Sequence, residues 1–460
     1  MCGIFGITDH KDSARLTYLS LFALQHRGQE SAGIASTLNR QMTSHSGMGI
    51  ASDVFSDQEI EKISGYCAIG HVRYSTTGSS HIKNAQPFVS NTRHGALALA
   101  HNGNLTNALQ IRKNLEGAGA IFHSSTDSEA ILHLLAHNPG SFEESLIESL
   151  KIIEGAYSLL ILTPDKMIAC RDPHGFRPLV LGKLGDSYVV SSETTALSLI
   201  KASYVREIEP GEIVFIESGK IRSVKPFSKL PLSRCIFELV YFARPDSVVF
   251  EKSVQAVRQS LGRALAREMK GIEADLVIPV PDSGVPAALG FSRESGIPFE
   301  IGLVRSHYIS RTFIKPNQEM RELAVDLKLS PVSEALKGKK IILVDDSIVR
   351  GTTSRKITKS LRISGAKEIH MAITSPPIIS ACYYGIDTPQ SEALIANQRS
   401  IEEIKKFLDV DSLRYLSLGA MRQASGESGD PDSRGFCDAC FTKNYPTPLP
   451  QELLAEKQSA

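Results

Sequence analysis

Short apolar runs separated by glycine-rich turns dominate the first half of the chain. They occupy residues 3–8, 96–100, 157–163, 167–171 and 188–191. Between them, apolar residues recur at helical spacing, as at 126–136. Strand-like runs that outnumber the helical segments and are joined by turns predict an α+β domain with antiparallel sheets.

The pattern changes after residues 224–231, VKPFSKLP, whose two prolines and two lysines predict a linker. Beyond it lie helical patterns at 254–270 and 354–364 and apolar runs at 276–280, 341–344 and 369–374. This alternation predicts a parallel sheet covered by helices, in which ligands bind at the carboxyl ends of the strands. The expected organisation is a first domain at 2–227, a second at 233–410 and a tail at 411–460.

Composition and charge narrow the classes of protein. The 460 residues include 51 Lys and Arg against 50 Asp and Glu, a formal net charge of +1. Nucleic-acid-binding proteins usually carry a basic field that this balance lacks. No apolar stretch approaches the roughly 18 residues that span a membrane, and the first residues lack a signal-peptide pattern. We expect a cytoplasmic protein without a nucleic-acid or membrane partner.

Cys2 follows the initiator methionine, and removal of Met1 would expose its α-amine. That amine can accept the thiol proton, so one residue would supply both nucleophile and base. The competing interpretation is a small buried cysteine in a first strand. Other polar residues also admit two interpretations. Arg73 can grip a carboxylate or form a surface ion pair. Asn102 and Gly103 can form an oxyanion hole or a hairpin turn. Asp127 can bind an ammonium group or simply begin a helix.

Five strings occur together in order: CGIFG at 2–6, LQHRGQ at 24–29, HVRYS at 71–75, HNGN at 101–104 and STDSE at 125–129. This set resembles the glutamine amidotransferase domain of the N-terminal-nucleophile hydrolase type, over about residues 2–227. The resemblance implies a four-layer αββα sandwich that hydrolyses glutamine to glutamate and ammonia. It makes Cys2 the nucleophile, Asn102 and Gly103 the oxyanion hole, and Arg73 and Asp127 the groups that hold the α-carboxylate and α-amine of glutamine.

The string IILVDDSIVRGTTS at 341–354 predicts a phosphate site. A buried strand ends in Asp345 and Asp346, and a turn rich in Gly, Thr and Ser then opens a helix. Free N–H groups and hydroxyls at a helix start bind a phosphate monoester, whereas the paired carboxylates suit a ribose diol and a metal-bound ligand. The Gly-Lys pair of a Walker A loop is absent from this string.

This string is similar to the phosphoribosylpyrophosphate (PRPP) motif of type I phosphoribosyltransferases. PDSG at 281–284 matches the pyrophosphate loop of that family, and YISRTFIKP at 308–316 matches its flexible catalytic loop. The resemblance implies one Mg²⁺ per subunit, near Asp345, Asp346 and Ser283. The resemblance implies that Arg311 and Lys315 bind pyrophosphate. The simpler interpretation of these two residues is a solvated basic loop. The residues implied for the 5′-phosphate are Ser347, Arg350, Gly351, Thr352, Thr353 and Ser354.

The two domains in this order resemble the amidophosphoribosyltransferase family over essentially the whole chain. The resemblance implies that ammonia from glutamine attacks C1 of PRPP, the first committed step of de novo purine biosynthesis. It also implies inhibition by purine nucleotides and a dimer or tetramer. A glucosamine-6-phosphate synthase would need isomerase domains in the second half, which the 341–354 string opposes. A PRPP-sensing regulator would not need Cys2, Arg73, Asn102 and Asp127.

The seven cysteines include a Cys-x-x-Cys pair, Cys437 and Cys440. With Cys235 and Cys382 they make four thiolates, which suit zinc or an iron–sulfur cluster, while a redox pair or buried thiols are the alternatives. The four positions match the cluster ligands of one branch of the amidophosphoribosyltransferases. This resemblance implies one structural [4Fe–4S] cluster per subunit that ties the tail to both domains. Cys67 and Cys170 are expected to be core residues.

Overall fold

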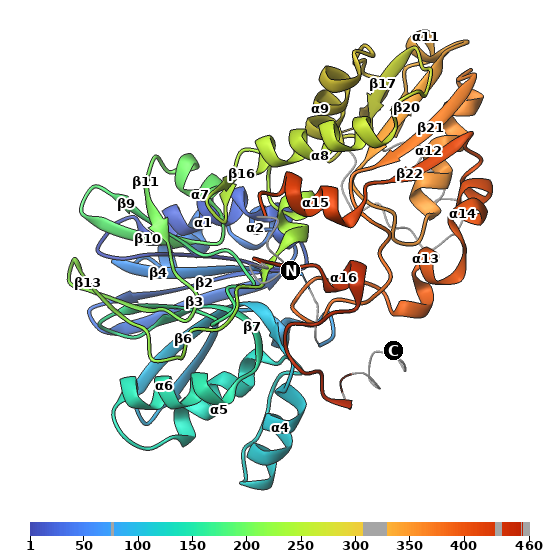
Figure 1. The fold of residues 1–460 in the computed structure, drawn as a ribbon. Coiled ribbons are helices and arrows are strands. Elements are labelled where there is room, and N and C mark those ends of the chain that lie inside the picture. The colour runs from blue at the N-terminus through green and yellow to red at the C-terminus, as the bar shows by residue number, and fades with distance from the viewer. Residues whose placement is uncertain (75–77, 307–328, 428–434, 452, 454–460) are drawn as a thin grey trace.

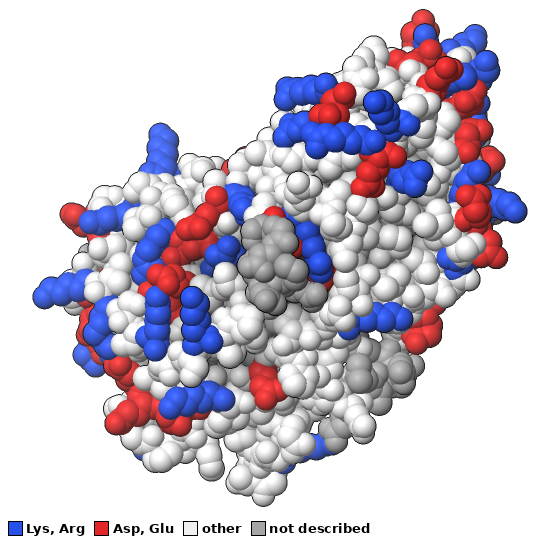
Figure 2. All heavy atoms as spheres, in the orientation of Figure 1, with Lys and Arg blue, Asp and Glu red and all other residues white. Residues whose placement is uncertain are grey.

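The computed structural model describes residues 1–74, 78–306, 329–427, 435–451 and 453. Two halves are joined by residues 225–233, and the N-terminus lies between them (Figure 1). On the face drawn in Figure 2, acidic and basic side chains are interspersed over both halves. Among the described residues, no helix is both long and apolar enough to cross a membrane.

The N-terminal half contains two antiparallel sheets that pack face to face. The first has the order β11 (Ser203–Glu207), β9 (Val180–Leu184), β10 (Ser187–Ser191), β1 (Gly3–Ile7), β4 (Cys67–Arg73), β2 (Ser31–Leu38) and β3 (Gln41–Met48). The second has the order β13 (Lys220–Val224), β12 (Ile213–Glu217), β8 (Met167–Arg171), β7 (Gly155–Leu162), β6 (Gly95–Leu105) and β5 (Phe88–Thr92). An apolar core that includes Ile4, Ile69, Leu160 and Val214 lies between the sheets.

Helices cover the outer face of each sheet (Figure 1). The first sheet carries α1 (Ser13–Ala23), α2 (Ala51–Val54), α3 (Asp57–Lys62) and α7 (Thr194–Leu199). The second carries α4 (Ala108–Gly117), α5 (Ser128–His137) and α6 (Phe142–Ile152). Because both faces of the sheets are covered, β7 is buried along its whole length, and all its residues except Ser158 are apolar, aromatic or glycine. The expected four-layer αββα sandwich is confirmed.

The C-terminal half is built on a parallel sheet of order β17 (Leu276–Pro279), β20 (Lys340–Asp345), β21 (Glu368–Ile373) and β22 (Ser412–Tyr415). Helices α8 (Val254–Glu268) and α9 (Val285–Ser295) pack on one face. Helices α12 (Thr352–Ile363) and α14 (Ile401–Leu408) pack on the other. Successive strand residues such as Ile342 and Leu343 face opposite cores, as expected for a sheet buried on both sides.

Shorter elements complete the described chain. They are the β-strands β14 (Arg234–Cys235), β15 (Val248–Val249), β16 (Lys252–Ser253), β18 (Leu303–Arg305), β19 (Leu329–Pro331) and β23 (Phe436–Cys437), and the α-helices α11 (Ser333–Leu336), α13 (Ile395–Gln398), α15 (Leu418–Ala424) and α16 (Ala439–Thr442). Short 3₁₀-helices are η1 (Gln25–Arg27), η2 (Ile82–Asn84) and η5 (Ser391–Ala393), and η3 (Glu238–Phe242) is a π-helix.

The parallel sheet continues beyond residue 410, where the sequence analysis placed the start of a separate tail. Strand β22 is its edge strand, α15 packs on α8, and β23 pairs with β14 next to the linker. β22 has only four residues and no long apolar run, so periodicity alone does not reveal it.

Candidate functional sites

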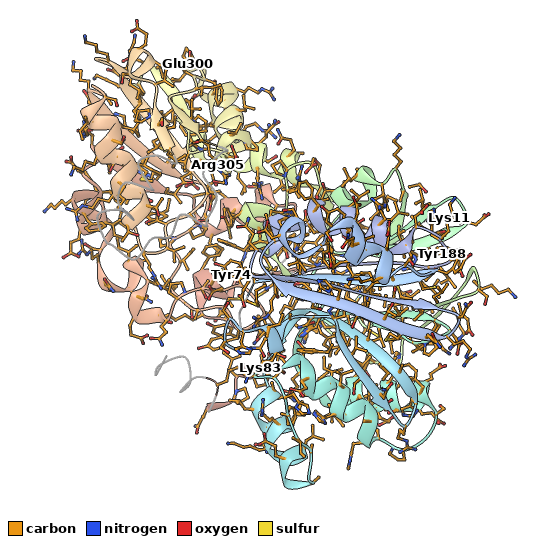
Figure 3. The ribbon with its side chains drawn as sticks, turned by 180° about the vertical axis from the view of Figure 1, so that it is seen from behind. Lys11, Tyr74, Lys83, Tyr188, Glu300 and Arg305 are labelled. Carbon is orange, nitrogen blue, oxygen red and sulfur yellow. The ribbon has the colours of Figure 1, made fainter. Side chains whose placement is uncertain are left out.

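A pocket at the start of β1 gathers the candidates of the N-terminal half. Cys2 directly precedes the strand and is 8% exposed. The lining comes from β1, β4, β6 and the segments around them: Cys2, Arg73, Tyr74, Gln86, His101, Gly103, Thr126, Asp127 and Ser128. Tyr74 lies at the end of the sheets that faces the C-terminal half (Figure 3). The fold thus brings Cys2, Arg73, Gly103 and Asp127 into one pocket.

Asn102 on β6 accepts a hydrogen bond from the backbone N–H of Cys2. The Cys2 N–H donates to Asn102 Oδ1 at 3.2 Å. The same side chain is fully buried, and its Nδ2 has no hydrogen-bond partner among the described residues. An unpaired buried donor costs free energy unless a ligand satisfies it. Asn102 therefore offers a free N–H donor beside the nucleophile, as an oxyanion hole requires.

Arg73 and Asp127 are both buried at the pocket wall. Arg73, 3% exposed, forms an ion pair with Glu30, and its Nη1 donates to the carbonyl oxygen of Ser79 at 3.3 Å. Asp127 Oδ2 accepts the N–H of Leu105 at 2.8 Å. The pocket therefore has a cation and an anion on its wall, the pair needed to bind an amino acid. Sequence reasoning missed Glu30, although a carboxylate directly after the Gln29 motif position was a usable signal.

His71 lies behind this pocket and is uncharged. Its Nε2 donates to the carbonyl oxygen of His101 at 3.0 Å. Complete burial, with the charge of Arg73, lowers the pKa of His71 to about 3. The neutral ring holds the backbone directly before Asn102, so it supports β6 without contributing charge.

Asp345 and Asp346 stand at the carboxyl end of β20, 8% and 6% exposed. Burial and the neighbouring Asp346 charge raise the pKa of Asp345 well above its usual range. Burial also raises the pKa of Asp346, opposed by hydrogen bonds from Ser347 and Ser283 and by the charge of Arg258. The structure thus places Ser283, from the turn after β17, beside Asp346. Two buried carboxylates with raised pKa values form a place where a cation can replace protons and the carboxylate oxygens can accept hydrogen bonds from a diol.

The turn between β20 and α12 has a geometry suited to a phosphate. Gly351 has φ +74°, and no described side chain caps the start of the 12-residue helix α12. Its first N–H groups are therefore available to an anion. Ser354 is buried, whereas Arg350, Thr352 and Thr353 are exposed. Ser347 differs from the others because its hydroxyl donates to Asp346 Oδ2 at 2.5 Å.

The sequence did not identify two arginines that the structure places beside the transferase site. Arg305 at the end of β18 forms a 2.7 Å ion pair with Asp282 in the PDSG turn. Buried Arg258 on α8 donates to the backbone oxygens of Leu239 and Ala243, and its charge lowers the pKa of Asp346. Both are set by tertiary contacts, so no local motif marks them. Arg311 and Lys315 lie outside the described residues.

The four cysteines assigned to a metal lie near one another, all within the C-terminal half. Cys235 and Cys437 are register partners in the β14–β23 pair. Burial, reinforced by the charges of the other cysteines, raises the pKa of Cys235 to about 11 and the pKa values of Cys437 and Cys440 well above the usual range. The Cys382 sulfur accepts two backbone N–H groups, from Tyr384 and Ile386, each at 3.4 Å.

The four cysteines do not form a single-ion site as they stand. In the described parts of the chain, no group of three or more His, Cys, Asp or Glu side chains is close enough to hold one metal ion. A cluster spreads its ligands further apart than a single zinc does. Burial lowers the pKa of Arg177, but the charges of Cys235, Glu238 and Cys382 outweigh it and raise that pKa. A buried cation thus lies beside thiols that would be ionised as ligands. Cys170 is fully buried in the core, and Cys67 is partly buried.

A fully buried ion network joins the halves next to the nucleophile. Arg27 Nη2 and Nη1 donate to the two oxygens of Glu238 at 2.7 and 3.0 Å, and Arg177 lies 3.4 Å from the same carboxylate. Arg27 also pairs with Glu193, while its Nε donates to the carbonyl oxygen of Cys2 at 3.0 Å. The backbone of Cys2 is therefore held by a network that includes a carboxylate of the other half.

Known proteins resemble both halves and the whole. A model of the glutamine amidotransferase domain matches residues 71–199, and one of the phosphoribosyl transferase domain matches residues 251–380. Amidophosphoribosyltransferase 1, chloroplastic, of Arabidopsis thaliana is 49% identical over 99% of this chain and 80% of its own length. The amidophosphoribosyltransferase of Bacillus subtilis is 45% identical over 98% of this chain and 95% of its own.

The chain also resembles solved structures of this kind of enzyme over almost its whole length. The glutamine PRPP amidotransferase of B. subtilis complexed with ADP and GMP superposes with a TM-score of 0.93 at 44% identity, covering 98% of both chains. A structure described as the allosteric regulatory enzyme of purine biosynthesis has a TM-score of 0.94 at 44% identity, covering 99% of both chains.

Proposed function

The chain belongs to the amidophosphoribosyltransferases, and on that basis we propose how its residues divide the reaction between two sites. The enzyme converts glutamine, PRPP and water into 5-phosphoribosylamine, glutamate and pyrophosphate, the first committed step of purine biosynthesis. The pocket at Cys2 releases ammonia from glutamine. The carboxyl end of the parallel sheet transfers that ammonia to C1 of PRPP.

In the glutaminase pocket, the Cys2 thiolate attacks the amide carbon of glutamine. The α-amine of Cys2, exposed by removal of Met1, takes the thiol proton and passes it to the leaving ammonia. Water then hydrolyses the thioester and releases glutamate.

The observation that carries this assignment is the free Asn102 Nδ2. As the carbonyl oxygen gains charge, this group and the Gly103 N–H donate hydrogen bonds to it. Arg73 binds the α-carboxylate of glutamine and Asp127 its α-amine. Glu30 keeps Arg73 oriented through their ion pair.

In the transferase site, Asp345 and Asp346 accept hydrogen bonds from the ribose hydroxyls, with Ser283 beside them. A Mg²⁺ held there would neutralise charge as pyrophosphate leaves. The start of α12, from Arg350 to Ser354, binds the 5′-phosphate through N–H groups and hydroxyls. Arg311 and Lys315 are proposed to neutralise pyrophosphate, and Arg305 contacts the PDSG turn at 281–284 through its ion pair with Asp282.

A [4Fe–4S] cluster on Cys235, Cys382, Cys437 and Cys440 is part of the proposal. Two backbone N–H groups on the Cys382 sulfur and the nearby Arg177 support a set of thiolate ligands. The cluster would crosslink the C-terminal segment to the strand that follows the linker, and so stabilise the boundary between the halves.

Inhibition by purine nucleotides is proposed from the relatives. The B. subtilis enzyme, 44% identical, forms a complex with ADP and GMP. Added GMP or ADP is expected to lower the rate at fixed PRPP. The measurement is pyrophosphate release against nucleotide concentration.

The test of the two-site assignment uses Cys2→Ala on anaerobically purified protein. We expect loss of glutamate formation from glutamine, while pyrophosphate release with added ammonia, PRPP and Mg²⁺ is retained. Cys67→Ala, a partly buried cysteine outside both sites, is the matched control and should keep both activities. Loss of both activities in Cys2→Ala with normal folding would show that the division of labour is wrong.

A further inference from the structure

A loop of the transferase half lies directly against the oxyanion strand of the glutaminase half. This 383–385 loop, residues Tyr383 to Gly385, follows Cys382 and precedes η5. It contacts β6 at two successive positions, Gly103 and Asn104, and is also held by Arg177 and Phe176. None of these contacts takes part in binding glutamine or PRPP in the proposed function.

The first contact is a hydrogen bond across the two halves. Asn104 Nδ2 donates to the carbonyl oxygen of Tyr383 at 3.0 Å, between residues 279 positions apart. Asn104 is 6% exposed. Side chains two positions apart on a strand share a face, so Asn104 lies on the same face of β6 as Asn102. One asparagine contacts the nucleophile and the other contacts the transferase loop.

The second contact joins two glycine backbones. A Cβ placed on Gly385 would lie 3.0 Å from both the carbonyl carbon and oxygen of Gly103, and Gly385 has φ +105°. A Cβ on Gly103 would lie 2.0 Å from the carbonyl oxygen of Ala156 on β7. Gly103 is therefore packed closely between β7 and the 383–385 loop. Only glycine at both positions allows so close an approach.

The third contact fixes the loop itself. Arg177 donates to the carbonyl oxygen of Tyr384 through Nε at 2.9 Å and Nη2 at 2.5 Å. The Tyr384 ring stacks on Phe176 with centroids 4.2 Å apart and an interplanar angle of 16°. The loop is thus held rigidly from the glutaminase side, and it cannot move without moving its contacts to β6.

We propose that the 383–385 loop positions the oxyanion hole, with Gly385 and Asn104 as positioning residues for glutamine hydrolysis. The inference rests on the proposed role of Asn102 and Gly103. An oxyanion donor acts only if it lies at hydrogen-bond distance from the developing charge, and removal of one donor costs about 10²–10³ in kcat. A shift of Gly103 by a few tenths of an ångström loses part of that factor.

The test compares Gly385→Ala and Asn104→Ala. We expect kcat with glutamine to fall about tenfold or more in each, because the hydrogen bonds to the oxyanion lengthen. The KM for glutamine should stay within about twofold, since Arg73 and Asp127 are untouched. Ammonia-dependent pyrophosphate release, the iron content per chain and the rate of Cys2 alkylation by iodoacetamide should equal those of the wild type.

Gly271→Ala is the matched control for backbone strain. Gly271 also lies in the transferase half and has φ +96°, but a Cβ there meets nothing within 4 Å. It should keep the wild-type kcat. If Gly385→Ala does not fold, Asn104→Ala carries the test alone, because it leaves the backbone of β6 unchanged and removes the hydrogen bond to Tyr383.

The outcomes separate this inference from the proposed function. If Asn102→Ala keeps the wild-type kcat with glutamine, the oxyanion assignment itself is wrong. If Asn102→Ala loses that activity but Gly385→Ala and Asn104→Ala do not, only the role of the loop is refuted. A loss of iron or of both activities in Gly385→Ala and Asn104→Ala would also refute it, because the effect would then be general.

Discussion

Glu238 is the residue whose removal should damage the contact between the halves most. It is fully buried on η3, directly after the linker, and its carboxylate accepts three hydrogen bonds from Arg27 and Arg177. Glu238→Ala would leave Arg27 paired with Glu193 and would take from Arg177 the carboxylate with which it forms an ion pair. The mutual repulsion of the two arginines would then be uncompensated, since the charge of Arg27 already opposes that of Arg177.

The magnitude follows from burial. Removing one partner of a buried ion pair costs about 3–5 kcal/mol, because the other charge stays in a medium of low dielectric. In halves of this size that cost lowers the melting temperature by about 10 °C. Glu238→Gln keeps one oxygen acceptor but no charge, so its effect should lie between those of the wild type and Glu238→Ala.

The assay is thermal unfolding followed by circular dichroism, with both activities measured at 25 °C in the same samples. The matched control is Glu294→Ala, which breaks a bidentate pair of Glu294 with Arg267 at 2.8 and 3.2 Å on the surface of the C-terminal half. Exposed pairs contribute little, so the control should keep the wild-type melting temperature. Equal shifts in Glu238→Ala and Glu294→Ala would refute the reasoning that burial makes this network important.

Three further predictions concern protons and metal. Because burial raises the pKa values of Asp345 and Asp346, binding of Mg²⁺ and PRPP should displace protons from this pair and should strengthen as the pH rises. Calorimetry in buffers of different ionisation enthalpy measures the release, and Asp346→Asn should reduce it; equal release in that variant would contradict the assignment. His71 binds its proton near pH 6.5 when unfolded but only near pH 3 when folded, so falling pH between these values should cost about 1.4 kcal/mol of stability per unit. Urea unfolding against pH measures this slope, which His71→Gln should remove; an unchanged slope in that variant would rule His71 out as its source. Cys437→Ser should lose bound iron and make the C-terminal segment more sensitive to protease, whereas Cys67→Ser should not; iron analysis and limited proteolysis decide, and full iron content in Cys437→Ser would exclude it as a ligand.

Local sequence determined the fold of each half and the family. The strand, turn and helix around Asp345 and Asp346 are contiguous, so their chemistry can be read along the chain. The strings around Cys2, Arg73, Gly103 and Asp127 are also local, and their order indicated one pocket, which the structure then showed. The individual roles of these residues stay predictions that the proposed variants test.

The tertiary structure alone decided how the two halves meet. The contacts of Arg27 with Glu238 and of Asn104 with Tyr383 join residues 211 and 279 positions apart. No periodicity or spacing records such pairs, because each partner is compatible with many surroundings until the chain has folded. β22 was missed for a similar reason, since four residues gain strand structure only by pairing with β21. Sequence thus determined the chemistry that each half carries. Packing decided that a transferase loop lies against the oxyanion strand, because that contact depends on two glycines whose missing side chains matter only when the backbones are brought together.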